Sequence, residues 1–489
     1  MELDIKKIHA NPPYGMISIL FIGAFAALLN NTLLNIALPT IMVEFDVSPA
    51  KVQWVTTSYM LVNGILIPAS AFLTQRFSNR KIFLTAMSLF TLGTFIAMIP
   101  PNFSILVLGR MLQASGSGMI MPLLMNIILI VFPIEKRGTA MGFFGLVMFV
   151  APAIGPTLSG WIVEHYSWRI LFALILPFGM IALIYASFRL KNLTPIKDMT
   201  LDVLSLVLSS IAFGGLLYGF SSVGDLGWNH YLVYVPITVG TITLFLFVRR
   251  QFTLREPMLD FRIYRFPMFA LSSVISVVVS ASMFSGMILT PLYVQEVRGI
   301  SPFHSGILML PGAIIMGLMS PITGRLFDKF GARILALIGL TVMVTTTFLL
   351  SSLTMEDSYF YLMTIYTVRM FGMSLVMMPV MTNGLNEIPM EANPHGTAIN
   401  NTLQQVSGAI GTAFLLTIMT TKSKSAGLEL ADKIASGKVM PDASLEHLAM
   451  LEGINHAFFI STILAFVALV LALFIKKPIP YENNIKGSM

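Results

Sequence analysis

The sequence has no cysteine and very little charge. Without a cysteine among its 489 residues, the chain can form no disulfide, thiol nucleophile or cysteine metal site. Only 11% of the residues are charged, whereas 56% are hydrophobic, and the mean hydropathy is +0.82. Soluble globular domains carry about 25% charged residues. The composition therefore excludes a soluble protein and predicts an all-α polytopic membrane protein.

Acidic side chains are missing from the middle of the apolar runs, although the chain has 23 Asp and Glu residues. A buried carboxylate can bind and release a proton, whereas an amide does not titrate. The apolar runs carry amides instead. Such amides either bond one helix to another or line a cavity for polar groups of a ligand. The candidates for a cavity lining are Asn30, Asn31, Asn35, Asn63, Gln113, Asn126, Asn401 and Gln405.

Fourteen apolar runs are long enough to cross a bilayer as helices. With the N-terminus in the cytoplasm, alternate loops place 21 Lys and Arg residues inside and seven outside, which is the positive-inside pattern. This bias also accounts for the net charge of +7 without nucleic-acid binding. We expect a multi-pass protein of the cell membrane with both termini cytoplasmic. The runs are 14–43, 52–74, 81–100, 104–132, 138–163, 168–188, 203–222, 232–249, 268–293, 303–324, 333–352, 359–386, 396–420 and 455–475.

The chain repeats itself at nearly one offset. The tripeptide 138–140, Gly-Thr-Ala, recurs at 396–398, and Arg110 recurs as Arg369. These matches predict two parallel six-helix bundles with two helices inserted between them. The predicted parts are a cytoplasmic tail (1–13), an N-terminal bundle (14–190), two inserted helices (191–255), a C-terminal bundle (256–475) with an extracellular loop (421–454), and a second cytoplasmic tail (476–489).

The apolar stretch 138–160 contains an unusual number of glycines and prolines. Membrane helices tolerate these residues because neighbouring helices satisfy the freed backbone groups and small residues allow close packing. The order Gly142, Gly155-Pro156 and Ser159-Gly160 resembles the antiporter motif of a transporter family. Further motifs of that family have counterparts at two other places. These are Asn30-Asn31-Thr32 together with 35–39 (Asn-Ile-Ala-Leu-Pro), and Trp168-Arg169.

Together these motifs identify the chain as similar to the major facilitator superfamily. Within it, the chain resembles the fourteen-helix drug:proton antiporters (EmrB/QacA-like), in particular the lincomycin-resistance-type branch of Gram-positive bacteria. The resemblance implies the major facilitator fold and multidrug efflux by proton antiport with alternating access. It also implies a monomer in the lipid bilayer that takes amphipathic small molecules and protons and has no cofactor, metal or enzymatic activity.

Two other classes of function stay open beside multidrug efflux. One is export of a cell's own metabolite or lipid, or passive facilitation. The other is a membrane-embedded enzyme or receptor, although the sequence shows none of the common catalytic motifs.

We infer the coupling and gating residues partly from the energetic cost of a charged side chain inside the bilayer and partly from the resemblance. Arg110 and Arg369 are expensive inside a bilayer, so each serves either coupling or a structural bond to backbone carbonyls. The resemblance implies that Asp328 closes the cytoplasmic side, where the first repeat has Gln75. Glu164, just beyond the antiporter stretch, is the leading candidate for a proton carrier. Gly155 and Pro156 belong to the same stretch, and the full set is Arg110, Asp328, Glu164, Arg369, Gly155 and Pro156.

Overall fold

The computed structural model describes residues 12–190, 192–193, 198, 201–435 and 444–477. Over these residues the chain forms helices and turns but no strand. Fourteen of the described helices are long and apolar enough to cross a membrane. The prediction of an all-α membrane protein with fourteen spans is therefore confirmed.

The spans divide into two groups of six with a pair between them. The N-terminal half comprises α2 (Tyr14–Leu33), α5 (Trp54–Arg76), α6 (Asn79–Met98), α7 (Phe103–Val131), α8 (Ile134–His165) and α9 (Arg169–Arg189). The inserted pair comprises α10 (Val203–Ser221) and α12 (Tyr231–Thr253). The C-terminal half comprises α13 (Pro267–Leu292), α14 (Pro302–Phe330), α15 (Ala332–Leu349), α16 (Tyr359–Ser374) with α17 (Met377–Leu385), α18 (Asn393–Ala435) and α19 (Ser444–Ala472).

Prolines break two of the predicted runs. After α2, the first run continues as a 3₁₀ turn and then as the short helix α3 (Leu38–Glu44), with Pro39 in its first turn. The predicted run 359–386 is divided between α16 and α17. Pro379 lacks an N–H and its ring clashes with the carbonyl group four residues earlier, which belongs to Leu375 in the break.

The described parts of the segment 421–454, which the sequence analysis expects to be an extracellular loop, are helical. The helix α18 extends to Ala435 and α19 begins at Ser444, so the two form a long helical hairpin. Lys422 Nζ lies 2.8 Å from Glu452 Oε1 across this hairpin. Hydropathy alone does not predict helices here, because the segment is polar. Its Ala, Leu, Glu and Lys residues are nevertheless strong helix formers, so the helices continue past the ends of the apolar runs.

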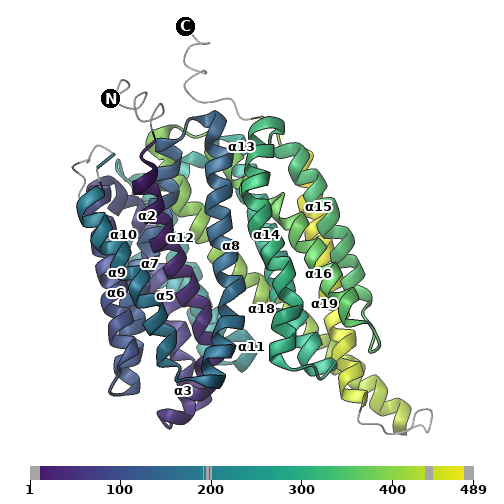
Figure 1. Cartoon of the computed structure of the whole chain (residues 1–489). Helices are drawn as coiled ribbons and strands as arrows, with labels where there is room; N and C mark the ends of the chain where they lie inside the picture. The colour runs from purple at the N-terminus through teal and green to yellow at the C-terminus, as the bar shows by residue number, and fades with distance from the viewer. Residues whose placement is uncertain (1–11, 191, 194–197, 199–200, 436–443, 478–489) are drawn as a thin grey trace.

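The two halves lie side by side with their helices running in roughly the same direction, and α8 and α14 are adjacent between them (Figure 1). The chain enters α2 and leaves α19 at the same end of the bundle, as an even number of crossings requires. The α18–α19 hairpin projects from the opposite end, at the lower right of Figure 1. α8 begins and α14 ends at the end of the bundle where α2 begins.

The inserted helix α10 contacts both halves. The ring of Trp54 on α5 stacks on Tyr218 of α10, with the ring centroids 6.2 Å apart. After the next short helix, α11 (Val223–Leu226), the indole N–H of Trp228 donates to the hydroxyl of Thr417 on α18, 2.6 Å away. The inserted pair therefore covers one side of the boundary between the halves, while α8 and α14 form the other side.

Candidate functional site

The carboxylate of Asp328 joins the two halves at the end of the bundle where α2 begins. Its Oδ1 accepts the backbone N–H of Gly138 at 2.8 Å, and its Oδ2 accepts the backbone N–H of Thr139 at 2.9 Å. The hydroxyl of Thr139 donates to the same Oδ2 at 2.6 Å. We call this set of three residues the latch. Amide groups near a helix N-terminus favour an anion, so a carboxylate suits this position.

Small residues bring α8 and α14 together behind the latch. A Cβ on Gly324 would overlap the backbone of Gly138, and one on Gly142 would overlap the carbonyl oxygen of Ser320. The two backbones touch without an intervening side chain, which larger residues would prevent. Gly155 contacts Thr32 of α2 instead, so it packs α8 within the N-terminal half.

A second set of contacts between the halves lies where the repeat predicts a counterpart of the latch. The amide Nε2 of Gln75, at the end of α5, lies 3.1 Å from Nε2 of His395 at the start of α18. Nδ1 of the same ring accepts the backbone N–H of Asp260 at 3.2 Å. Arg137, which directly precedes Gly138 in the N-terminal half, also bonds to the C-terminal half: its Nη1 donates to Oδ1 of Asn386 at 3.1 Å. At position 75 the first repeat therefore has a neutral amide, whereas the equivalent position of the second repeat has the carboxylate of Asp328.

Sequence reasoning missed Arg137 and Asn386 and did not place His395 at the closure. The signal was present, because the repeat that aligns 138–140 with 396–398 also aligns Arg137 with His395. The equivalent positions each precede the Gly-Thr pair and each reach the other half.

Arg110 lies in the core of the N-terminal half and is fully buried. Its Nε donates to the carbonyl oxygen of Val55 at 3.1 Å, and its Nη1 donates to Oε1 of Gln113 at 2.9 Å. The guanidinium carbon stands 4.2 Å from the centroid of the Tyr59 ring, which gives a cation–π contact. These contacts fit both interpretations of Arg110, a structural bond to a backbone carbonyl and a role in coupling. The residue bonds to the carbonyl of Val55 and also begins a network of side chains.

The network continues from Gln113 across three helices. Gln113 Nε2 donates to Oδ1 of Asn30 at 3.2 Å and to the hydroxyl of Thr94 at 2.8 Å. In parallel, Tyr59 donates to Ser117 at 2.8 Å, and Ser117 donates to Asn63 Oδ1 at 2.9 Å. Three of the predicted amides, those of residues 30, 63 and 113, thus gather around one arginine.

Arg369 occupies the matching place in the C-terminal half. Its Nε donates to the hydroxyl of Thr347 at 3.1 Å, and its Nη2 donates to the carbonyl oxygen of Ser282 at 2.6 Å. Thr347 and Thr94 are themselves related by the repeat. The guanidinium lies against the backbone of Gly286, where any Cβ would overlap it. Each half therefore has a buried arginine, which bonds the related threonine directly in the C-terminal half and through Gln113 in the N-terminal half.

Comparison with known proteins agrees with this two-half architecture. A model of the Major Facilitator Superfamily matches residues 20–412. The chain belongs to the major facilitator superfamily.

The relatives of this transporter align along nearly its full length. It is 43% identical to the lincomycin resistance protein LmrB of Listeria monocytogenes, over 95% of this chain and 97% of that protein. It is 46% identical to the uncharacterized MFS-type transporter YcnB of Bacillus subtilis, over 95% of both chains. The solved structure of the human organic anion transporter MFSD10 (TETRAN) matches with a TM-score of 0.65, covering 94% of this chain and 99% of that one. Its 13% identity shows the fold alone.

The four remaining predicted amides whose side chains the structure describes are not bonded to the Arg110 network. Asn31 is exposed, and Gln405 is half-buried on α18. Asn401, also on α18, donates to the carbonyl oxygen of Thr397 at 3.0 Å and lies near α7. Asn126 is buried, and neither atom of its amide has a hydrogen-bond partner. The side chains of Asn35 and Pro156 lie outside the described part of the structure.

The carboxylates at the helix ends have distinct environments. The bond from Arg169 holds the pKa of Glu44 below its usual range, and Trp168 adds a second bond to the same carboxylate. Arg250, with the hydroxyl of Ser205, lowers the pKa of Asp202 to about 2. A third carboxylate, Glu387, accepts the backbone N–H groups of Met268 and Phe269 at 2.7 and 3.1 Å. Glu164 is exposed near the C-terminus of α8.

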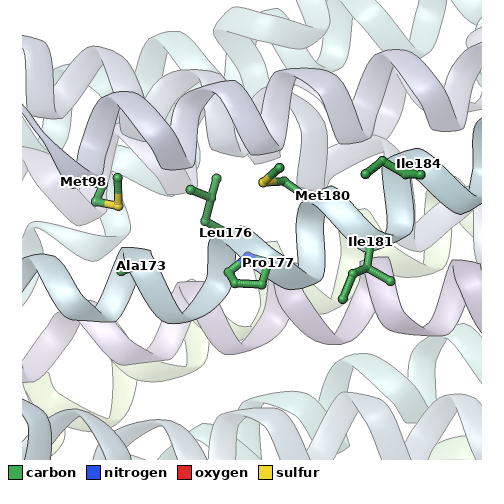
Figure 2. Close-up of a pocket in the computed structure, with 7 residues that line it drawn as sticks. All are labelled: Met98, Ala173, Leu176, Pro177, Met180, Ile181 and Ile184. Atoms are coloured by element: carbon green, nitrogen blue, oxygen red, sulfur yellow. The ribbon is translucent and has the colours of Figure 1, made fainter.

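A groove of about 370 Å³ opens on the outer side of the N-terminal half, between Met98 at the end of α6 and a row on α9 (Figure 2). Its lining is apolar, and Met180, Ile181 and Ile184 are exposed there. A groove without polar groups on an outer face suits lipid chains and lacks the groups that would orient a substrate. The lining residues are Met98, Ala173, Leu176, Pro177, Met180, Ile181 and Ile184.

Proposed function

We propose that this transporter exports amphipathic drugs from the cytoplasm in exchange for protons. The observation that carries the proposal is the latch, which joins the two halves at one end through a single carboxylate. Rocking of two halves about a central site needs a contact of this kind that forms and breaks. The name of the relative LmrB, a lincomycin resistance protein, supports drugs as cargo.

The distribution of Lys and Arg supports a cytoplasmic location for the end of the bundle where α2 begins. The latch lies at that end, because α8 begins there and α14 ends there. We therefore interpret the described arrangement as closed toward the cytoplasm. In this account, breaking the latch admits drug from the cytoplasm, and re-forming it commits the drug to release outside.

The charge inventory indicates which drugs suit the site. Among the described residues, none of the buried side chains is an Asp or Glu. A divalent cation at mid-membrane would meet amides and guanidinium groups, and desolvating an unpaired ion costs several kcal/mol. Neutral or singly charged amphiphiles with many hydrogen-bonding groups are therefore the preferred cargo. We assign the cavity lining to Asn31, Asn63, Asn401 and Gln405, because the other described amides of the predicted set are at most 1% exposed.

The proton carrier in this proposal is a carboxylate at a helix end. Arginines hold Glu44 and Asp202, and backbone amides hold Glu387, whereas Glu164 is exposed. Glu164 is therefore the first candidate, and Arg110 and Arg369 are proposed to transmit its state. A variant with Gln at all four carboxylates should lose export that a protonophore abolishes. Continued protonophore-sensitive export by that variant would place the carrier elsewhere.

The second candidate function is passive facilitation or export of a cell's own metabolite. The absence of a buried carboxylate among the described residues favours it over coupled export. Efflux assays in a bacterium without its own pumps decide between the two. Coupled drug export predicts accumulation against a gradient that collapses with a protonophore, and facilitation predicts equilibration that the protonophore leaves unchanged.

A further inference from the structure

The apolar groove on the outer face of the N-terminal half has the length of a lipid chain. Its lining follows α9 from Ala173 to Ile184, with Met98 on the neighbouring α6 (Figure 2). At about 1.5 Å per residue this row is about 16 Å long, which is about half of a hydrocarbon core that is about 30 Å thick. The groove therefore fits one acyl chain of a lipid from a single leaflet.

The apolar lining alone does not select a lipid for this groove. The interior of a bilayer is as apolar as the lining side chains, so a chain gains little by moving from one to the other. Selection requires a contact with the headgroup at one end of the groove. At the end where α9 begins, Arg169 Nη2 lies 2.6 Å from Oε1 of Glu44, and the indole N–H of Trp168 donates to the same carboxylate. The charge of that arginine is therefore already compensated.

The opposite end of the groove carries arginines without an acidic partner. Nη2 of Arg80 donates to the carbonyl oxygen of Ser187 at 2.7 Å, and Ser187 stands one turn beyond Ile184, the last residue of the lining. Arg189 follows on the same helix. Both arginines are exposed, and neither takes part in an ion pair among the described residues. The sequences of α6 and α9 contain no Asp or Glu, so this end attracts an anion.

Exposed aromatic side chains place these arginines at the level of the lipid headgroups. Phe188 and Tyr185 are both exposed on the last turns of α9, and tyrosine is enriched where a membrane helix meets the headgroup region. A lipid whose headgroup lies at this level extends its chains inward along α9. Its chain therefore enters the groove at Ile184 and ends near Ala173.

We propose that Arg80 and Arg189 bind the phosphate of an anionic phospholipid, one chain of which lies in the groove between α6 and α9. The guanidinium group suits this ligand because its planar N–H donors match the oxygens of a phosphate. A net negative headgroup is favoured over a zwitterionic one, since the cationic group of the zwitterion opposes the arginines. The site lies on the outer face of the N-terminal half and is distinct from the drug pathway proposed above.

A fluorophore beside the groove reports which lipid occupies it. The chain contains no cysteine, so Ser88→Cys can carry a single bimane label. Ser88 is exposed on α6, one turn before Thr91, which lies against Gly179 of α9. The labelled full-length protein is reconstituted in phosphatidylcholine nanodiscs that contain a minority of lipid with dibrominated chains, which quench the label at short range. The brominated lipid is phosphatidylglycerol in one sample and phosphatidylcholine in the other.

The expected result is stronger quenching by the anionic lipid. Each Lys or Arg beside an anionic headgroup favours it about 5-fold, so two arginines favour it about 25-fold. We expect brominated phosphatidylglycerol to quench the label severalfold more strongly than brominated phosphatidylcholine. Arg80→Gln combined with Arg189→Gln should abolish this excess. Arg189→Gln alone should lower the preference about 5-fold and serves if the double variant does not fold.

Matched controls separate this site from general surface charge and from the general apolar surface. Arg249→Gln combined with Arg255→Gln removes two exposed arginines at the end of α12 and should leave the excess unchanged. Ala173→Phe fills part of the groove and should lower the excess. Val239→Phe adds the same ring to an exposed position of α12 and should have no effect.

Equal quenching by the two lipids in the labelled protein without further substitutions would overturn the proposal, as would an excess that survives the loss of Arg80 and Arg189. An equal fall in the Arg249 and Arg255 control, or equal effects of the two Phe variants, would also overturn it, because the preference would then arise elsewhere. None of these measurements involves drug or proton movement. The result therefore stands apart from the success or failure of the proposed export function.

Discussion

Replacing Asp328 with Asn should open the latch while preserving its shape. The carboxylate accepts three hydrogen bonds, from the N–H groups of Gly138 and Thr139 and from the Thr139 hydroxyl. An Asn side chain keeps one oxygen and turns an NH₂ group toward the remaining donors. Hydrogen bonds to a charged group contribute about 1.5–3 kcal/mol each. Because Asp328 is half-buried, we discount the combined loss to about 2–3 kcal/mol, or about 30- to 150-fold in the ratio of closed to open transporter.

The matched control is Gln75→Ala, at the equivalent position of the first repeat. Gln75 makes a neutral contact with His395, and a neutral hydrogen bond contributes about 0.5–1.5 kcal/mol. The expected shift is therefore about 2- to 10-fold. Asp328→Asn should consequently impair drug efflux much more than Gln75→Ala.

Spin labels on either side of the latch measure the closure itself. The chain contains no cysteine, so Lys136→Cys and Lys329→Cys can be labelled without background, and both positions are exposed. Pulsed dipolar spectroscopy should show a short distance in the otherwise wild-type protein and a dominant longer distance once Asp328→Asn is added. Equal distance distributions for Asp328→Asn and Gln75→Ala would refute the reasoning that the carboxylate controls the closure.

Three further predictions follow from the network, the charge inventory and the ion pairs. Arg110→Ala should reach the membrane at normal levels but export no drug, while Arg110→Lys, which keeps the charge without the planar fork, should separate charge from geometry; near-wild-type efflux by the Ala variant would contradict this. Efflux of neutral or singly charged antibiotics should exceed that of divalent quaternary cations in one strain, and robust export of the divalent cations would show that a carboxylate reaches the cavity. Arg169 lowers the pKa of Glu44, and Arg250 lowers the pKa of Asp202 to about 2. Both carboxylates thus stabilise the fold above their unfolded pKa values and lose that effect only as the pH falls through the lowered ones. The single variants Glu44→Gln and Asp202→Asn should leave the pH profile of efflux between about pH 5 and 8 unchanged, and a displaced profile in either would argue against these ion pairs.

Hydropathy predicted the spans because the thickness of the bilayer sets their length, and the internal repeat predicted which positions of the two halves are equivalent. A span of about twenty apolar residues is needed wherever a helix crosses hydrocarbon, so the fourteen spans were recovered. Positions such as Arg110 and Arg369 could be paired because the repeat preserves their places in each half. The extension of α18 to Ala435 was missed because a helix outside the membrane needs no apolar signal.

The partners of the gating residues depend on packing between the halves, which sequence spacing does not encode. Asp328 was expected to close the cytoplasmic side, but its contacts with Gly138 and Thr139 required coordinates. Gly155 belongs to the same motif as Gly142, yet it contacts Thr32 within its own half whereas Gly142 contacts α14. Two glycines of one helix thus face different neighbours, because a helix presents a new side every few residues.

Uptake into proteoliposomes under an imposed pH gradient tests the central claim, proton-coupled drug export, most directly. Purified wild-type protein is reconstituted with a neutral, lincomycin-like amphiphile as substrate, and Arg110→Ala protein serves as the inactive control. We expect the wild type to accumulate drug above its external concentration only while the lumen is more acidic than the outside, and we expect a protonophore to abolish this accumulation. Drug that merely equilibrates across the membrane, at the same rate with and without the gradient, would contradict it.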